Sequence, residues 1–215
     1  AATEGLGPDG FTYSVCTASH ADETSKRLDQ IIEEVRGGAE RTIVVGTGHG
    51  TCTCQGAAFE YIFNVDYKLR KEGVRDRITL VWLSNEYELG DFGMGGMHLK
   101  RGGYITNSKI FTESVMAERD IKWIIRSHVE KIDEDTIYIE KLDGTRVTLH
   151  YDFAMLLPPF SGVGLKAYDR NGGDITALLF APSGFMKVDG DYSGKPYEEW
   201  RADDWDPALR HWSLP

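Results

Sequence analysis

A glycine-rich turn over 46–56, GTGHGTCTCQG, constrains the fold more than any other stretch of the chain. A β-branched run over 42–45 precedes it, and a pattern with apolar residues on one helical face follows over 55–71. The next apolar run, 78–83 (ITLVWL), does not alternate, which indicates a parallel strand covered on both faces. Strand, glycine turn, helix and strand predict an α/β fold with a Rossmann-like parallel sheet and crossover helices.

Other signals predict the elements around this unit. The dipeptide Asp143-Gly144 favours the tight turn of a β-hairpin, and the runs on either side of it have strand composition. This hairpin is similar to the β-meander of the NAD-binding-type domains of flavin disulfide reductases. We therefore expect a helix over 21–36, a helix over 107–118 capped by Thr106 or Asn107, a strand over 121–132, a hairpin of 136–142 with 145–151, and a strand over 153–157.

The composition of the stretch over 84–103 is not that of a helix or a strand. Its segment LGDFGMGGMHLKRGG contains six glycines and two methionines, too many glycines for a regular element. We expect a loop here, without a local element to cover the side chains of Phe92, Met94 and Met97.

Composition limits the function. With 215 residues, 41% of them hydrophobic, the chain is long enough for one domain and an appendage. We expect a lead-in segment and helix over 1–40, a Rossmann-like central domain over 41–160 and an irregular connection over 161–215. The formal net charge of −10 argues against a nucleic-acid partner. The chain shows neither a signal peptide nor an apolar run that could span a membrane, and it does not begin with Met, so we expect a soluble piece of a longer protein.

The glycine turn does not match the dinucleotide fingerprint. That fingerprint needs glycines at positions one, three and six, and the sixth position is Thr51 when counted from Gly46 and Thr53 when counted from Gly48. The acidic ribose partner is expected about 20 residues on, whereas the candidate Glu86 comes far later. The simplest interpretation is that the glycines only permit the turn from strand to helix. We expect the isolated chain to bind neither NADH nor FAD appreciably.

The turn also carries two of the three cysteines, Cys52 and Cys54. Their spacing is not that of a C-x-x-C redox motif, and only His49 lies close enough in sequence to join them at a metal, so we predict no metal site. Cys54 lies at the start of the helix predicted over 55–71, where unpaired backbone N–H groups and the helix dipole stabilise a thiolate. A small buried residue packed under the helix is an equally good interpretation.

The residues after the turn resemble the sulfide:quinone oxidoreductase family of flavoproteins, within the pyridine nucleotide-disulfide oxidoreductase superfamily. The family pattern is Cys-x-Gly-x-Ala-aromatic-Glu-aromatic, and CQGAAFEY beginning at Cys54 follows it. The segment SVCTASHAD, with Cys16 and His20, is similar to another family segment, as are YELGDFGMGG, DFAMLLPPFSGV and GFMKVDGDY. The resemblance runs across almost the whole chain and implies the central domain of a longer protein, with 161–215 leading to a C-terminal flavin-binding and membrane-associating part.

The resemblance also implies roles. Cys54 would form a disulfide with a cysteine outside this chain, hydrosulfide would convert it to a persulfide, and electrons would pass through FAD to a quinone. Cys16 would lie near the flavin, and His20 would carry protons, although a structural His20 with a satisfied ring fits equally well. Cys52 has no family counterpart, and we interpret it as a small residue lining the turn. The implied catalytic residues are Cys54, Cys16 and His20, and the implied FAD contacts are Cys16, Gly46, Gly48, Gly50, Pro159 and Phe160.

Three other interpretations stay open. The chain could be the NAD(P)H-binding domain of a type II NADH:quinone reductase or of another pyridine nucleotide-disulfide oxidoreductase. It could also be a non-catalytic Rossmann-like interaction module, or part of a flavocytochrome-linked sulfide dehydrogenase, which differs only in its electron acceptor. The favoured hypothesis makes sulfide and a quinone the partners, leaves a homo-oligomer open, and expects the longer protein to be peripherally membrane-associated through its C-terminal part. The fragment alone should be inactive.

Overall fold

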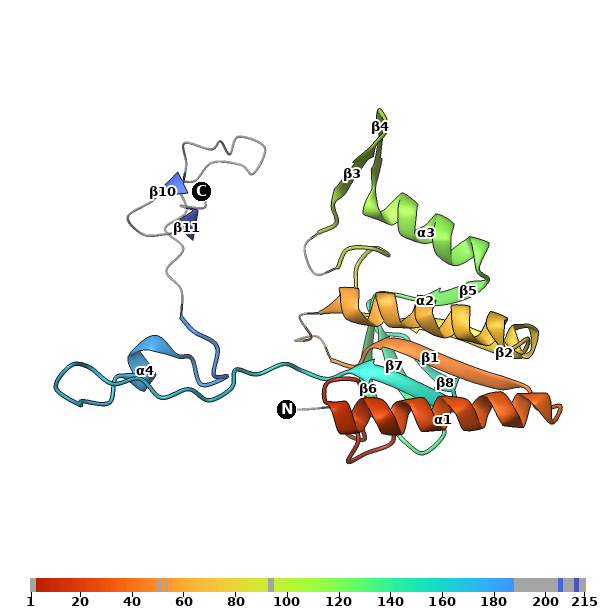
Figure 1. The fold of residues 1–215 in the computed structure, drawn as a ribbon, viewed down its shortest axis with the longest axis horizontal. Coiled ribbons are helices and arrows are strands. Elements are labelled where there is room, and N and C mark those ends of the chain that lie inside the picture. Colours follow the sequence, from red (N-terminus) through yellow and green to blue (C-terminus); the bar gives the residue numbers. More distant parts are fainter. Residues whose placement is uncertain are drawn as a thin grey trace. The chain divides into compact units, whose positions relative to one another are not determined.

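The computed structural model describes residues 3–49, 52, 54–92 and 95–187, together with two short strands near the C-terminus (Figure 1). The chain divides into two units, Ala1–Phe160 and Ser161–Pro215. The second unit contains the one-turn helix α4 (Thr176–Leu179) and the paired strands β10 (Trp205–Asp206) and β11 (His211–Trp212). The candidate site lies in the first unit.

A four-stranded parallel sheet forms the centre of the first unit. Its strands are β1 (Arg41–Thr47), β2 (Ile78–Leu83), β5 (Ile121–Ile124) and β9 (Phe153–Leu157), in the order β5-β2-β1-β9. Nearly every residue of β1, β2 and β9 is buried, as expected of parallel strands covered on both faces. The predicted α/β fold with a parallel sheet is confirmed.

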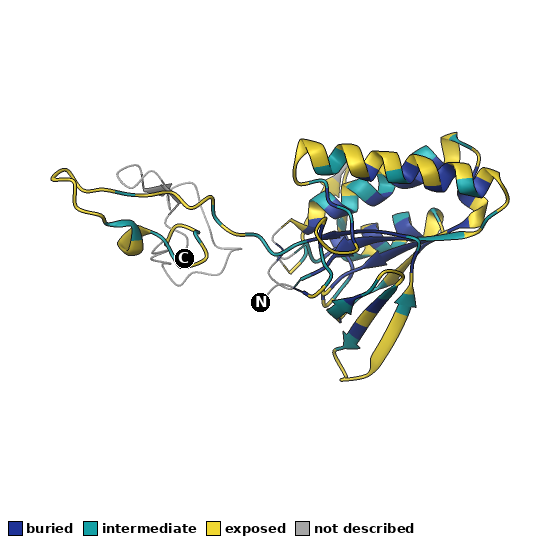
Figure 2. Cartoon of the chain, turned by 90° about the horizontal axis from the view of Figure 1, so that it is seen from below, coloured by how far each residue is buried: buried dark blue, intermediate teal, exposed yellow. Residues whose placement is uncertain are grey.

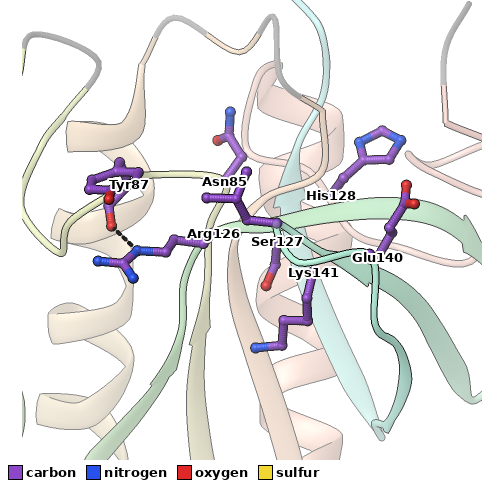
Figure 3. A pocket seen from close by; sticks show the side chains of 9 residues that line it. Asn85, Tyr87, Arg126, Ser127, His128, Glu140 and Lys141 are labelled. Atoms are coloured by element: carbon purple, nitrogen blue, oxygen red, sulfur yellow. Dashed lines mark hydrogen bonds between the residues drawn. The ribbon is translucent and has the colours of Figure 1, made fainter.

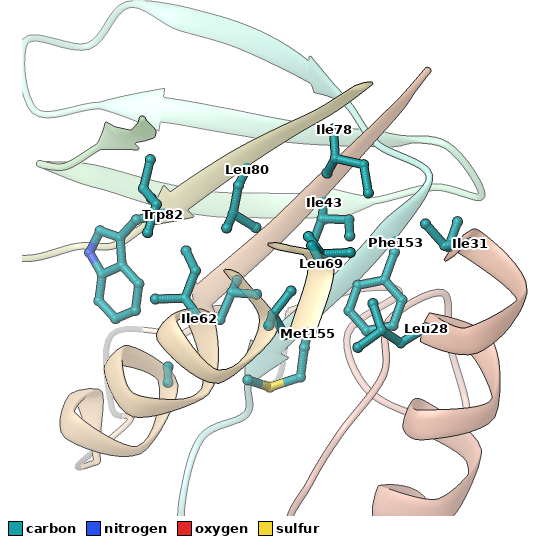
Figure 4. Close-up of a cluster of buried hydrophobic side chains, with 14 of the residues drawn as sticks. Leu28, Ile31, Ile43, Ile62, Leu69, Ile78, Leu80, Trp82, Phe153 and Met155 are labelled. Carbon is teal, nitrogen blue, oxygen red and sulfur yellow. The ribbon is translucent and has the colours of Figure 1, made fainter. Parts of the chain in front are cut away.

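Different layers cover the two faces of the sheet. Side chains alternate along each strand, so Ile43 joins the core under helices α1 (Ala18–Arg36) and α2 (Gln55–Lys71), while Val44 faces the other way (Figure 4). That other face packs on the meander β6 (Ser127–Ile132), β7 (Thr136–Lys141) and β8 (Arg146–His150). Figure 2 shows the result as buried inner faces and exposed outer faces on the helices.

The meander begins at a sharp bend that the sequence did not indicate. The strand expected over 121–132 is wrong, because the chain breaks into β5 and β6 at Arg126, whose φ is 55°. The backbone N–H of Arg126 donates to the carbonyl oxygen of Glu86 at 2.8 Å, and this contact holds the bend. The expected hairpin around Asp143-Gly144 is confirmed as β7 and β8.

The glycine-rich stretch after β2 contains a second hairpin, so the expectation of a loop without elements is wrong there. Strands β3 (His98–Arg101) and β4 (Tyr104–Asn107) pair antiparallel around Gly102 and Gly103, whose φ values are 56° and 88°. Two successive positive φ angles form the tight turn that joins the strands. Helix α3 (Ser108–Glu118) follows directly, and the Asn107 side chain caps it by accepting from the N–H of Ile110, as predicted.

A buried ion cluster links α2 to the segments before β2 and β5. The Asp66 carboxylate has no exposed surface and accepts hydrogen bonds from Arg70, Arg75 and Arg119, with the bond from Arg75 Nε measuring 2.7 Å. Burial alone would raise the pKa of Asp66, but these hydrogen bonds outweigh it and hold the pKa below its usual value. The 3-10 turn η1 (Arg75–Arg77) supplies the most buried of these partners.

Candidate functional site

The glycine turn leaves the sheet at the carboxyl end of β1. A Cβ at Gly46 would lie 1.8 Å from the carbonyl oxygen of Leu83, on the neighbouring strand, and one at Gly48 would lie 2.4 Å from Leu6 Cδ1. The N–H of Gly48 donates to the carbonyl of Leu157 at 2.9 Å. The packing of protein atoms therefore accounts for both glycines without a ligand. Gly50 lies outside the described residues, and the assignment of these glycines to a cofactor stays a prediction.

Cys54 is the residue that precedes the first turn of α2. Its carbonyl oxygen accepts from the N–H of Ala57 at 3.1 Å, its side chain makes no capping hydrogen bond, and its thiol is exposed. The predicted start of the helix at Gln55 is confirmed. The alternative in which Cys54 is a buried residue under the helix is wrong, because the side chain faces solvent.

Cys52 has the opposite environment. It is 4% exposed, packs in the core under the helices, and donates its N–H to the carbonyl of His49 at 3.1 Å. Burial raises the pKa of its thiol; the N–H of Cys54 lowers it, and the charges of Cys54 and Cys16 raise it further. Of the three cysteines, Cys16 and Cys54 present exposed thiols, whereas Cys52 is buried.

Cys16 follows a segment that runs along the edge of the parallel sheet, beside β9. In this segment the N–H of Tyr13 donates to the carbonyl of Ala154 at 2.8 Å and the Tyr13 ring stacks on Phe153 with centroids 5.1 Å apart. The N–H of Cys16 then donates to Ser14 Oγ at 3.1 Å. A long-range pairing thus brings Cys16 toward the glycine turn, 36 residues and more along the chain, which no local pattern could have indicated.

His20 has a different neighbourhood. It lies in the first turn of α1, where the Thr17 hydroxyl accepts from its backbone N–H at 3.2 Å. Its ring lines a cavity of about 350 Å³ together with Tyr151 and Asp152, which precede β9 at the amino edge of the sheet. Within the described part of the chain, its buried Nδ1 has no hydrogen-bond partner. The proposed proton-carrying role of His20 stays a prediction.

Pro159 and Phe160 follow β9 at the same edge of the sheet as Cys54. Both are half-buried, and Phe160 packs against the core under the helices. Their proposed contact with a flavin also stays a prediction.

A buried carboxyl group organises the loop after β2. Glu86 is 5% exposed, and its two oxygens accept from the N–H of Phe92 at 2.7 Å and from the indole N–H of Trp82 at 3.3 Å. Burial raises the pKa of this carboxyl group above its ordinary value, although the hydrogen bonds oppose the rise. The Phe92 ring meets Phe59 of α2 edge-on, with centroids 5.1 Å apart. The expectation that no local element covers the Phe92 side chain is therefore wrong. Met97 is exposed as expected. Met94 lies outside the described residues.

A hollow of about 410 Å³ lies between this loop and the meander (Figure 3). The Nε of Arg126 donates to the carbonyl of Tyr87 at 2.7 Å, and its guanidinium lies 4.3 Å from the centroid of the Tyr87 ring. Asn85, His128 and Lys141 also line it, but no cysteine does, so this hollow is separate from the thiols. No local sequence pattern indicates this hollow, since it depends on the bend at Arg126.

No described helix combines the length and the apolar composition that crossing a bilayer requires. Among the same residues, no three His, Cys, Asp or Glu side chains are placed to hold a metal ion.

Comparisons with known proteins identify relatives. No family model matches the chain. The sulfide-quinone reductase of Aquifex aeolicus (strain VF5) is 33% identical over 156 residues, which are 73% of this chain and 33% of that protein. The X-ray structure of the sulfide:quinone oxidoreductase from the same bacterium matches with a TM-score of 0.61 at 31% identity, over 74% of this chain and 34% of that one.

A more distant match is NDH2 from Plasmodium falciparum in complex with NADH, with a TM-score of 0.47 and 16% identity over 72% of this chain and 31% of that one. A likeness this distant carries no argument about function. The chain spans about a third of the length of the relatives it matches.

Proposed function

We propose that this chain, which belongs to the sulfide:quinone oxidoreductase family, is the central segment of a flavoprotein that oxidises sulfide and passes the electrons to a quinone. The observation that carries the proposal is the exposed thiol of Cys54 at the start of α2, in a segment about a third identical to a sulfide-quinone reductase. We assign Cys54 as the thiol that handles the sulfur.

The position of Cys54 suits a nucleophile or a disulfide partner. Cys54 directly precedes the first turn of α2, where the helix dipole concentrates partial positive charge. The side chain is exposed, so hydrosulfide can reach the sulfur. Cys52 lacks both advantages, because it is buried and its burial disfavours the thiolate.

The sulfur step can be written in full. In the whole protein, Cys54 forms a disulfide with a cysteine outside this chain. Hydrosulfide attacks the Cys54 sulfur, the S–S bond breaks, and the products are a Cys54 persulfide and the thiolate of the other cysteine. The incoming sulfur is oxidised as the disulfide is reduced. A second hydrosulfide then takes the outer sulfur of the persulfide as a hydrogen disulfide anion and leaves Cys54 as a thiol, and the disulfide forms again when the two cysteines lose two electrons to the acceptor and one proton to solvent. FAD in the whole protein would supply that acceptor, with a quinone as the final partner.

The described residues offer only part of a flavin site. Leu83 and Leu6 occupy the Cβ side of Gly46 and Gly48, and the contacts of these glycines with FAD stay a prediction from the family resemblance. Cys16 is the exposed group that a flavin could approach, with Pro159 and Phe160 at the same edge of the sheet. We therefore assign the phosphate contacts of FAD to the rest of the whole protein.

Replacing Cys54 in the full-length protein tests the assignment. Cys54→Ser should abolish sulfide-dependent quinone reduction and leave the flavin bound, because it removes the sulfur and leaves the fold intact. Cys52→Ser is the matched control, two residues away, and should keep most of the activity. Wild-type turnover in Cys54→Ser would show that another thiol handles the sulfur.

Two measurements on the 215-residue chain separate the competing interpretations. Timed alkylation followed by peptide mass spectrometry should modify Cys54 and Cys16 well before Cys52, in line with their exposure. An interaction module has no need of a reactive thiol, and slow modification of Cys54 would favour it. Saturable binding of NADH at micromolar concentrations would instead favour the NADH-reductase interpretation.

A further inference from the structure

The hollow between the loop after β2 and the meander lies outside the carboxyl ends of two neighbouring parallel strands. Asn85 follows β2, Arg126 follows β5, and β2 pairs directly with β5. The end of β7 supplies the third wall, through Lys141 and Leu142. In open α/β sheets, ligands bind beyond the carboxyl ends of the strands, where separate segments bring their side chains together. The hollow therefore has the position of a ligand site.

Arg126 is held by four contacts that leave the end of its guanidinium group available. Its backbone N–H donates to the carbonyl of Glu86, its own carbonyl accepts from the N–H of Leu142 at 2.9 Å, and its Nε donates to the carbonyl of Tyr87. The guanidinium also lies over the Tyr87 ring. Within the described part of the chain, neither terminal nitrogen of this group has a hydrogen-bond or ion-pair partner. Such a fixed pair of donors matches the oxygens of a carboxylate or a phosphate.

Lys141 supplies a second cation from a different segment. Side chains alternate along β7, so Lys141 lies on the same side of the strand as the buried Ile139. Lys141 is half-buried, and among the described residues no carboxylate forms an ion pair with it. A partly desolvated ammonium group without a counter-charge is unfavourable, and a bound anion would lower that cost.

Glu140 is the one carboxylate among the described residues that line the hollow, and it lies away from the two cations. It is on the opposite side of β7 from Lys141, directly across from His128 on β6 and from Arg146 on β8. In Figure 3 its carboxylate lies beside His128, at the far side of the hollow from Arg126. Glu140 therefore does not neutralise the two cations directly.

Other charged groups near the hollow already have partners. The Asp143 carboxylate accepts from the N–H of Thr145 at 2.9 Å, and this bond is the main cause that lowers the pKa of Asp143, with the charge of Lys141 a lesser one. Glu88 forms an ion pair with Lys109 at 2.9 Å, and that pair adds no net charge. The hollow thus keeps an excess of positive charge in a chain whose net charge is −10.

We infer that this hollow binds a small organic oxyanion, either a carboxylate or a phosphate monoester. The charged group of the ligand meets Arg126 and Lys141, and its apolar body lies against Leu142, which lines the hollow and is 69% exposed. A volume of about 410 Å³ is larger than an inorganic ion requires and falls in the range of sites for small organic molecules. This inference uses no thiol and stands or falls independently of the proposed function.

NMR titrations of the isotope-labelled 215-residue chain test the inference. Phenyl phosphate and benzoate combine an oxyanion with an apolar ring, whereas inorganic phosphate has only the charge and phenol only the ring. We expect phenyl phosphate or benzoate to shift the backbone resonances of Ser127 and Leu142 saturably at millimolar concentrations. Inorganic phosphate and phenol should bind at least about tenfold more weakly, because each lacks one half of the contacts.

The tighter of the two organic anions identifies the charged group that the hollow prefers. If neither of them bound saturably, or if phenol or inorganic phosphate bound as tightly, the inference would be overturned.

Matched variants locate the binding surface. Lys141→Gln should weaken binding of the tighter anion by about tenfold, and since the Lys141 side chain makes no hydrogen bond within the described residues, the fold should not change. Arg126→Gln should weaken binding at least as much. Lys71→Gln and Arg36→Gln make the same changes at exposed residues at the ends of α2 and α1 and should bind as the wild type does. Circular dichroism confirms that each variant is folded. Wild-type affinity in Lys141→Gln or in Arg126→Gln would overturn the inference.

Discussion

Two glycine-rich segments leave the same edge of the parallel sheet, and their glycines serve different purposes. In the turn after β1, the backbone of Leu83 leaves no room for a Cβ at Gly46, whereas a Cβ at Gly48 would displace the end of the Leu6 side chain. In the stretch after β2, Gly95 has a φ of 74° and no atom within 4 Å of a Cβ, and Gly102 and Gly103 are alike in this respect. Gly46 is therefore needed for close packing, and Gly95, Gly102 and Gly103 are needed for the direction of the backbone. Gly90 in the second segment combines both, with a φ of 83° and a Cβ position 2.7 Å from the carbonyl oxygen of Ser108.

The two segments also differ in how they are held. The first is bonded to the sheet itself, through the carbonyl of Leu157, and it presents Cys54 at a fixed place. The second depends on side chains, with Glu86 receiving two hydrogen bonds and Phe92 packing on Phe59. Substitutions in the first segment should therefore lower the stability of the parallel sheet, whereas substitutions in the second should disturb only the loop after β2.

The largest effect is expected at Gly46. Gly46→Ala places a Cβ 1.8 Å from the carbonyl oxygen of Leu83, and backbone atoms of a central strand cannot move aside cheaply. We expect a loss of about 3 kcal/mol or more in the free energy of unfolding, the upper end of overpacking effects. Urea denaturation followed by circular dichroism measures it.

The matched control for this change lies in the second segment. Gly95→Ala adds the same methyl group in open space, but at a φ of 74° that alanine adopts reluctantly. It should cost about 1–2 kcal/mol. If both variants lost the same stability, the distinction between packing and backbone direction would be wrong.

An intermediate effect is expected at Phe92. This residue holds a φ of 53°, and its half-buried ring meets Phe59. Phe92→Ala keeps the positive φ and removes the ring, so it should lower the free energy of unfolding by about 1–2 kcal/mol, less than at a fully buried phenylalanine.

Two comparisons isolate the contribution of that ring. Met97→Ala, at an exposed side chain of the same stretch, should change stability by less than about 0.5 kcal/mol. Phe92→Gly should be less harmful than Phe92→Ala by about 1 kcal/mol, because glycine relieves the left-handed backbone. A Phe92→Ala variant as stable as the wild type would show that the ring does not anchor the loop.

The sequence predicted what local periodicity determines. The limits of α2, β2 and β9, the Asp143-Gly144 hairpin and the place of Cys54 all follow from short patterns of apolar residues and turn residues. The β3–β4 hairpin was not predicted, because its strand sequences HLKR and YITN lack the apolar–polar alternation of a half-buried strand. Without that alternation, the dipeptide Gly102-Gly103 is equally typical of a loop.

Long-range contacts account for the other misses. Arg126 adopts a positive φ because its N–H meets the carbonyl of Glu86, 40 residues earlier, and no local signal shows this. The three arginines around Asp66 and the pairing of the segment before Cys16 with β9 likewise depend on how distant segments pack. The sequence could thus locate the thiol at the start of α2, but not the path of the segment that carries the other exposed thiol, Cys16.

The smallest effect should be a titration in the second segment. Burial raises the pKa of Glu86 above its ordinary 4.5, so the stabilising contribution of this group is complete below that pH and is lost as the pH rises through its folded-state pKa. Because the indole N–H of Trp82 donates to Glu86, its proton resonance should shift with a midpoint above 4.5. The indole resonance of Trp123, which lies partly exposed on β5, serves as the internal reference.

In Glu86→Gln the Trp82 shift should disappear. One of the two N–H donors also loses its acceptor, at a cost of about 1 kcal/mol in the free energy of unfolding. A Trp82 midpoint at or below 4.5, or one that persists in Glu86→Gln, would mean that this carboxyl group does not hold the loop in the way its hydrogen bonds indicate.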